Sequence, residues 1–177
     1  MSSEPDKRVW LGLSTTDTFI GRAIRWITNQ PASHAWVSFW DESLERRVVM
    51  EASSSGYRVI TWRRWLAEMQ PKLKLWVFVT PHHDLTGGLH SVSSFLGTPY
   101  DLKALLWHSV GRWFRRWIKH PFTSPRKLYC SEAVVRILQD SVFPGAFRLN
   151  EEDTRPGDLL LYLEQSQYTE RIEVDVP

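Results

Sequence analysis

The chain is poor in cysteine, with a single one, Cys130, in 177 residues. One cysteine excludes an intramolecular disulfide, and it excludes a metal site built from cysteines alone. The sequence also contains no run of about 18 apolar residues, so no membrane-spanning helix is expected. The polar start at residues 1–8 lacks the apolar core of a secretory signal. We therefore expect a cytoplasmic protein, with association with a membrane surface as the alternative.

The net charge is only +2, but the charged residues are unevenly distributed along the chain. Residues 61–130 contain eleven basic and three acidic side chains, whereas residues 131–177 contain four basic and ten acidic ones. A basic segment favours an anionic surface, such as lipid headgroups or nucleic acid. The alternative is that the basic segment packs near the acidic one. Length and a hydrophobic content of 42% fit one globular domain over residues 1–177.

Hydrophobic periodicity and turn residues divide the chain into strands and helices. Strands are expected at 9–13, 34–40, 47–52, 57–60, 73–79, 159–162 and 169–176. Helices are expected at 17–29, 61–69 and 84–96, and a turn at 97–101 is expected to lead into a helical region that continues to about residue 119. A further helix is expected to begin at Cys130. The strands at 34–40 and 47–52 would form an antiparallel hairpin.

Cys130 lies where its helix begins, because apolar residues at 133, 134, 137 and 138 follow helical spacing. A thiol in the first turn of a helix is close to free backbone N–H groups and to the positive end of the helix dipole. Both favour the thiolate, which is the nucleophilic form of cysteine. The alternative interpretation is a small buried apolar residue.

A cysteine nucleophile needs a base, and the base needs an acceptor that orients it. If the hairpin turn is centred between residues 42 and 43, His34 lies directly opposite Glu51 on one face of the sheet. The carboxylate would then accept from one imidazole nitrogen and leave the other for Cys130. A shift of one residue in this register would send Glu51 to the other face. Taken alone, each residue is also compatible with an ordinary place on a strand.

Six short segments, in this order, resemble the circularly permuted branch of the NlpC-type papain-like hydrolases. These are the YiiX-like proteins, which are related to the lecithin–retinol acyltransferase group. The segments are Ser-His-Ala-Trp-Val at 33–37, Val-Met-Glu-Ala at 49–52, Gly-Tyr-Arg-Val at 56–59, Gly-Thr-Pro-Tyr-Asp at 97–101, Tyr-Cys-Ser-Glu at 129–132 and Arg-Pro-Gly-Asp-Leu at 155–159. Tyr-Cys-Ser-Glu is the most specific of them, and the resemblance covers residues 9–162.

The resemblance implies an α+β, permuted papain-like fold, with an antiparallel sheet packed against helices and the nucleophile at a helix N-terminus. It implies that Cys130 is the nucleophile, that His34 is the general base and acid, and that Glu51 orients the imidazole. The expected reaction is hydrolysis of an amide or peptide-like bond, such as one in a cell-wall fragment, through a thioester. The chain departs from the family at 12–13 and 35–36, and residues 103–125 resemble an enlarged, Trp-rich basic insertion.

Three groups are candidates for substrate and oxyanion binding: the backbone N–H of Cys130, the Tyr129 hydroxyl and Trp36. For Tyr129 the alternative is a packing tyrosine. Neighbouring Ser131 and Glu132 also suit the capping of a first helical turn. No cofactor is expected. No metal is expected either, because the spacing of the histidines at 82, 83 and 90 matches no standard site.

The segment 105–120 combines tryptophans with basic residues at helical spacing. The residues expected to face a membrane are Trp107, Trp113, Phe114 and Trp117, with Arg112, Arg115, Arg116 and Lys119 as the basic group. Such a helix binds an anionic membrane interface, but the same pattern is found in helices packed on a protein core. Nucleic acid is not expected, since no nucleic-acid motif accompanies the segment.

Two other functions stay open beside the amide hydrolase. The first is a lipid-acyl hydrolase or acyltransferase that acts at a membrane surface, and the second is a catalytically silent binding protein. The substrate would accordingly be a peptide-like compound, another small molecule or a lipid. The sequence leaves the oligomeric state open.

Overall fold

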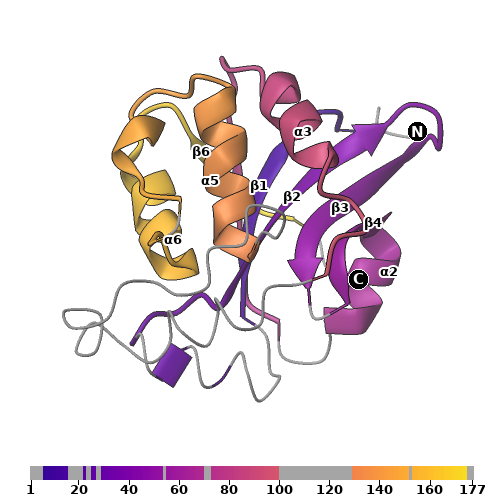
Figure 1. The fold of residues 1–177 in the computed structure, drawn as a ribbon, viewed down its shortest axis with the longest axis horizontal. Coiled ribbons are helices and arrows are strands. Elements are labelled where there is room, and N and C mark those ends of the chain that lie inside the picture. Colours follow the sequence, from indigo (N-terminus) through magenta and orange to yellow (C-terminus); the bar gives the residue numbers. More distant parts are fainter. Residues whose placement is uncertain are drawn as a thin grey trace.

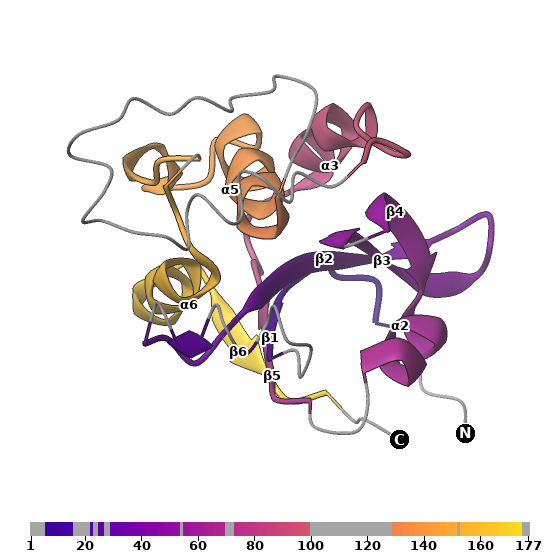
Figure 2. The ribbon, with the colours of Figure 1, turned by 60° about the horizontal axis from the view of Figure 1, so that its bottom comes forward.

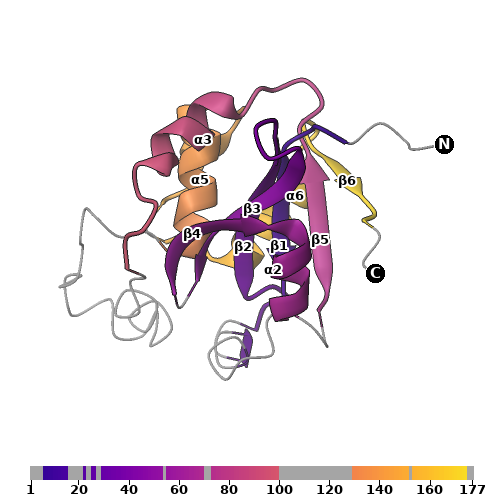
Figure 3. The same cartoon turned by 90° about the vertical axis from the view of Figure 1, so that its right-hand side faces the viewer.

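The structure, a computed structural model, describes residues 6–15, 22, 25–26, 29–53, 55–69, 73–99, 129–151 and 153–174. Its centre is an antiparallel sheet of six strands in the order β4-β3-β2-β1-β5-β6. The strands are β1 (Trp10–Ser14), β2 (His34–Asp41), β3 (Arg46–Ser53), β4 (Gly56–Thr61), β5 (Leu75–Val79) and β6 (Glu170–Ile172). Strands β4 and β6 form the two edges (Figure 3).

Helices cover both faces of the sheet. They are α2 (Trp62–Met69), α3 (Thr86–Ser93), α5 (Cys130–Asp140), α6 (Pro156–Gln165) and a short 3-10 helix, η1 (Ala146–Arg148). The helices α3 and α5 lie on one face and α2 lies on the other (Figure 2). Helix α5 packs against β2 and β3, and α6 packs beside it (Figure 1). The molecule is therefore an α+β protein with the sheet as its middle layer.

Each face of the sheet has its own hydrophobic core. On the α5 face, side chains such as Leu11, Val37 and Ile137 are buried to 1% exposure or less. The core on the α2 face is rich in tryptophan, with Trp36 and Trp65 at its centre. Strand alternation explains this division, because neighbouring residues of one strand point to opposite faces. The active-site candidates lie where β2 begins, at the end of the sheet.

Most elements expected from the sequence are present. The strands expected at 9–13, 34–40, 47–52, 57–60 and 73–79 and the helices expected at 61–69 and 84–96 are confirmed, with small shifts of their ends. The strand expected at 159–162 is wrong, because these residues lie inside α6. Of the helix expected at 17–29, the described residues 22, 25 and 26 are helical. The helical region expected after the turn at 97–101 and the insertion expected at 103–125 lie outside the described residues.

Candidate active site

Cys130 is the first residue of α5, as the sequence indicates. Tyr129 before it is extended, and its backbone N–H donates to the Glu132 carboxylate at 3.3 Å. This bond fixes the start of the helix, since a Glu at the third position commonly caps the residue before the first turn. Ala133, Val134 and other apolar residues of α5 are buried against the sheet. The helix therefore holds the thiol, which is only 3% exposed, against the start of β2.

His34 is the first residue of β2 and connects the thiol to a carboxylate. Its Nε2 atom lies 2.6 Å from Oε2 of Glu51. The Cys130 thiol is close enough to raise the pKa of the imidazole. Because Nε2 is taken by Glu51, Nδ1 is the nitrogen left for the thiol. The three side chains come from α5, β2 and β3 and are all buried.

The register of the β2–β3 hairpin differs from the expected one by two residues. Glu51 lies opposite Trp36 rather than opposite His34, because the turn is centred one position later, between Ser43 and Leu44. Glu45 in this turn adopts a positive φ of 49°. A shift of two residues keeps Glu51 on the same face, where a diagonal neighbour is still within reach of long side chains. The contact between His34 and Glu51 therefore forms, although the predicted pairing was wrong.

Two residues that the sequence analysis missed complete the surroundings of Glu51. Arg58 donates to Oε1 through Nε at 3.0 Å and through Nη2 at 2.6 Å. Trp65 donates its indole N–H to Oε2 at 2.8 Å. Each carboxylate oxygen thus accepts two hydrogen bonds, and Glu51 is 1% exposed. Pairing β3 with β4 across Gly56 would have found Arg58, which lies directly opposite Glu51.

These contacts shift the pKa of all three buried groups. Burial alone would raise the pKa of Glu51, but hydrogen bonds from His34, Arg58 and Trp65 and the imidazolium charge lower it to about 2. Burial likewise opposes charge on His34, yet its bonds to Cys130 and Glu51 raise its pKa. Burial would raise the pKa of the Cys130 thiol, but the hydrogen bond and charge of His34 lower it. The three shifts together favour a thiolate–imidazolium pair.

Backbone N–H groups add to the stabilisation of the thiolate. Those of Ala35 and Ser131 act as hydrogen-bond donors to Cys130 and lower the pKa of its thiol further. The Ser131 hydroxyl donates to the Thr154 backbone carbonyl at 2.7 Å, which ties the start of α5 to the segment before α6. The sulfur is therefore surrounded by donors from both the strand and the helix.

The remaining candidates for substrate binding have other partners. The Tyr129 hydroxyl donates to the backbone carbonyl of Glu151 at 2.5 Å, so it is not directed at the thiol. Trp36 is 1% exposed and packs against Trp62 and Trp65, with ring centroids 5.5 and 4.7 Å away. These placements give Tyr129 and Trp36 packing roles. Of the expected donors to an oxyanion, the backbone N–H of Cys130 stays a prediction.

The expected membrane-facing residues lie outside the described part of the chain. They are Trp107, Arg112, Trp113, Phe114, Arg115, Arg116, Trp117 and Lys119. Whether segment 105–120 binds lipid therefore stays a prediction. Among the described residues, no helix has the length and apolar character that crossing a bilayer requires.

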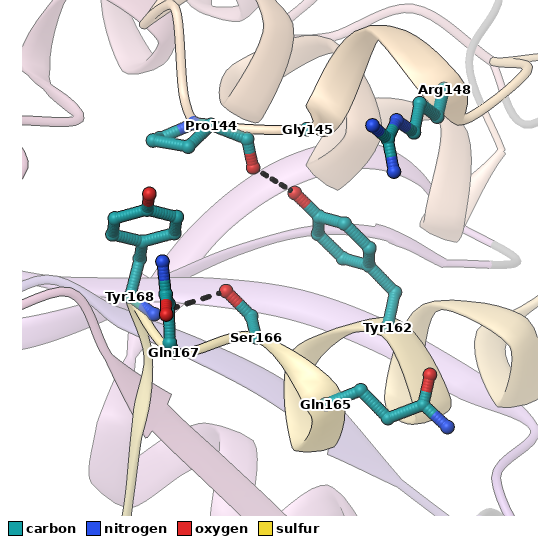
Figure 4. A pocket seen from close by; sticks show the side chains of 8 residues that line it. All are labelled: Pro144, Gly145, Arg148, Tyr162, Gln165, Ser166, Gln167 and Tyr168. Atoms are coloured by element: carbon teal, nitrogen blue, oxygen red, sulfur yellow. Dashed lines mark hydrogen bonds between the residues drawn. The ribbon is translucent and has the colours of Figure 1, made fainter.

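A separate surface pocket of about 420 Å³ lies beyond the C-terminal end of α5. It is formed by residues of the 144–148 turn, by the end of α6 and by Tyr168 (Figure 4). Tyr162 on one wall donates its hydroxyl to the Pro144 carbonyl at 2.8 Å. No thiol, imidazole or carboxylate lines this pocket, so it lacks the groups that the chemistry at Cys130 would use.

The fold is similar to the crystal structure of the metalloprotein yiiX from Escherichia coli O157:H7, with a TM-score of 0.58. The two chains are 13% identical, and the match covers 99% of this chain and 100% of that one. The chain matches no family model and no curated protein. The likeness shows a yiiX-like fold, as the sequence predicts, and at this identity it shows the fold alone.

That neighbour is a metalloprotein, and a metal ion at Cys130 would need donor atoms that have no other partner. Both oxygens of Glu51 already accept two hydrogen bonds each, and His34 Nε2 is taken by the same carboxylate. Across the described residues, no three His, Cys, Asp or Glu side chains gather where they could bind one ion. The residues described at this site therefore do not fit a metal, and no step of the reaction proposed for Cys130 runs through one.

Proposed function

We propose that the protein is a thiol hydrolase that cleaves an amide or peptide-like bond, with a cell-wall fragment as the candidate substrate. Cys130 is the proposed nucleophile, His34 the general base and acid, and Glu51 the residue that orients the imidazole. One observation supports this best. A buried imidazole lies 2.6 Å from a carboxylate, and its interaction with the only cysteine, at a helix start, raises the imidazole pKa and lowers the thiol pKa.

The proposed reaction has two halves. The Cys130 thiolate attacks the acyl carbon, and the C=O electrons move to oxygen, where the backbone N–H of Cys130 stabilises the oxyanion. The His34 imidazolium then protonates the leaving amine as the C–N bond breaks, which leaves a thioester. In the second half the neutral imidazole takes a proton from water, hydroxide attacks the thioester, and the acid and the thiolate are released.

The permuted papain-like fold is part of the same proposal. In this chain the imidazole comes first, the carboxylate second and the thiol last, which is the order of the family that the sequence resembles. The yiiX-like sheet with a cysteine at the start of the crossing helix is compatible with that family. A silent binding protein would have no need for the paired shifts of the Cys130 and His34 pKa values.

The test is the alkylation of Cys130 by iodoacetamide across pH. An ordinary thiol titrates near pH 8.5, whereas a thiolate held by an imidazolium reacts well below pH 7. We expect the wild-type rate to stay high down to acidic pH and the His34→Ala variant to lose this reactivity. A wild-type thiol that titrates near 8.5, with no change in His34→Ala, would show that Cys130 is no activated nucleophile.

A second measurement separates a nucleophile from a hydrolase. With p-nitrophenyl acetate, an activated acyl donor, we expect a burst of p-nitrophenol and an acetyl group on the Cys130 peptide in the mass spectrum. Cys130→Ala removes both, and His34→Ala slows the release of acetate. A reactive thiol that never acquires the acetyl group would favour the binding protein instead.

A further inference from the structure

The charges around the proposed nucleophile alternate in sign and sum to zero. In the active form the sulfur of Cys130 is negative, His34 is positive, Glu51 is negative and Arg58 is positive. We call these four residues the charge cluster. Within it, Glu51 connects His34 at 2.6 Å with Arg58, whose shortest bond to the carboxylate is also 2.6 Å. Three of the four side chains are buried, and the Arg58 side chain is 23% exposed.

Without Arg58 the same three buried groups would carry a net charge of −1. A buried charge without a partner costs several kcal/mol, so such a cluster takes up a proton instead. The sites open to that proton are the Cys130 thiolate and the Glu51 carboxylate. Either choice damages the proposed pair, because the first removes the nucleophile and the second removes the acceptor that orients His34.

We propose that Arg58 is a positioning residue that balances the charge of the cluster and so allows the Cys130 thiolate to exist beside ionised Glu51. The inference rests on the proposed role of Cys130 and His34 and adds a fourth member to that site. Arg58 acts through Glu51, because its Nε and Nη2 groups both donate to Oε1 of that carboxylate as charge-assisted hydrogen bonds.

Every element packed around Glu51 contributes to this balance. His34 comes from β2, Arg58 from β4, the indole of Trp65 from α2 and Cys130 from α5. The same Nη2 of Arg58 also donates to Glu68 of α2 at 2.7 Å. Glu68 in turn accepts from exposed Arg64 at 2.9 Å, so the alternation of charges continues to the surface. Arg64 contacts Glu68 and offers a control with the same chemistry outside the cluster.

The test uses iodoacetamide alkylation of Cys130 from pH 4 to pH 9, which needs no substrate. Arg58→Met is expected to move the acidic limb of the rate profile upward by about one pH unit. A neighbouring opposite charge usually shifts a pKa by about 1–3 units, and the lower end applies because Arg58 is partly solvated. At pH values below both limbs the rate should then fall about tenfold. Arg58→Lys keeps the charge and should move the limb less than Arg58→Met does. Arg64→Met should leave it in place.

A double variant distinguishes charge from shape. Arg58→Met with Glu51→Gln removes one positive and one negative charge, so the limb should return toward its wild-type position. The role of Arg58 would be overturned if the limb of the double variant moved further from wild type than that of Arg58→Met. It would also be overturned if the rate profile of Arg58→Met matched that of Arg64→Met. Circular dichroism checks the fold of each variant, and Arg58→Gln replaces Arg58→Met if the latter does not fold.

Failure of this inference is distinguishable from failure of the proposed function. If the wild-type thiol itself titrates near pH 8.5, the proposed nucleophile fails before Arg58 is considered. If the wild-type thiol titrates at acidic pH and Arg58→Met titrates at the same pH, Cys130 is still supported as the nucleophile. Only the charge-balancing role of Arg58 is then contradicted.

Discussion

At the scale of single residues, Glu51 carries the densest set of interactions near the thiol. A carboxylate that is 1% exposed is stable only because His34, Arg58 and Trp65 supply four donors. Removing one partner from a buried pair typically costs about 3–5 kcal/mol, since the other charge is left without compensation. The same donors that orient His34 therefore also stabilise the fold.

Glu51 should make stability depend on pH in the acidic range. Its pKa is lowered from 4.5 to about 2 by these partners. A lowered pKa means that the stabilisation is complete above the unfolded value and is lost as pH falls through the folded value. We expect the free energy of unfolding to decrease by about 3 kcal/mol over this window, measured by urea denaturation at several pH values.

The control for this effect compares two carboxylates. Glu51→Gln removes the titrating group and should flatten the acidic part of the stability curve relative to wild type. Glu42→Gln, at an exposed position on the β2–β3 turn, should leave the curve parallel to that of wild type. Parallel curves for both variants would mean that Glu51 does not gain its charge stabilisation in the folded state.

At the scale of elements, α3 packs closely against α5, the helix that begins with Cys130. A Cβ atom added at Gly88 would lie 2.1 Å from the backbone carbonyl oxygen of Ile137 in α5, closer than any real contact. The nearest atom to a Cβ at neighbouring Gly87 is the Asp140 oxygen, at 3.9 Å. Gly88 therefore sets the distance between the two helices, and Gly87 does not.

These adjacent glycines give a matched pair of variants. Gly88→Ala should lower the free energy of unfolding by about 1–3 kcal/mol or more, because the clash is with backbone and α3 must move. Gly87→Ala should leave stability unchanged or raise it by up to about 1 kcal/mol, as expected when a helical glycine gains a side chain without a clash. Urea denaturation measures both. Equal losses for the two variants would contradict the packing described for Gly88.

Elements with clear periodicity could be predicted from the sequence, and a short apolar run without such periodicity could not. The alternation at 34–40 and the spacing after Cys130 identify β2 and α5 directly. The short apolar run at 159–162 is compatible with a strand or a buried helix, and periodicity alone does not decide between them. Pro156 at the first helical position, and Asp158, which accepts from Arg155 N–H at 3.2 Å, make it part of α6.

For the site, the order of the three residues and the contact of His34 with Glu51 could be predicted, because both follow from local pattern and hairpin geometry. The correct register could not be predicted, because the backbone of Glu45 in the turn at 42–45 adopts a positive φ, and a glutamate in the sequence does not indicate this conformation. Arg58 could have been found from the β3–β4 hairpin, whereas Trp65 requires knowing how α2 packs on the sheet. The catalytic roles stay proposals.

At the scale of the whole molecule, the proposed site depends on both faces of the sheet. The thiol belongs to the core on the α5 face, whereas the indole donor to Glu51 comes from α2 on the other face. His34, as the first residue of β2, lies at the end of the strand where groups from both sides meet. The arrangement exists only when both cores are packed, so the two faces should unfold together.

Trp65→Ala tests this coupling, because it removes a fully buried ring from the α2 face alone. The free energy of unfolding should fall by about 3–5 kcal/mol. Trp10, Trp36 and Trp62 remain in the core of the α2 face, so part of the fluorescence change reports on that face. Far-ultraviolet circular dichroism is sensitive to the helices of the α5 face. If the sheet couples the two cores, both signals should shift to the same lower urea midpoint.

Leu44→Ala, at a residue 51% exposed, should move neither midpoint. A fluorescence midpoint that falls while the circular dichroism midpoint stays would mean that the faces unfold separately, and the thiol could then remain in place after Glu51 has lost its support from α2.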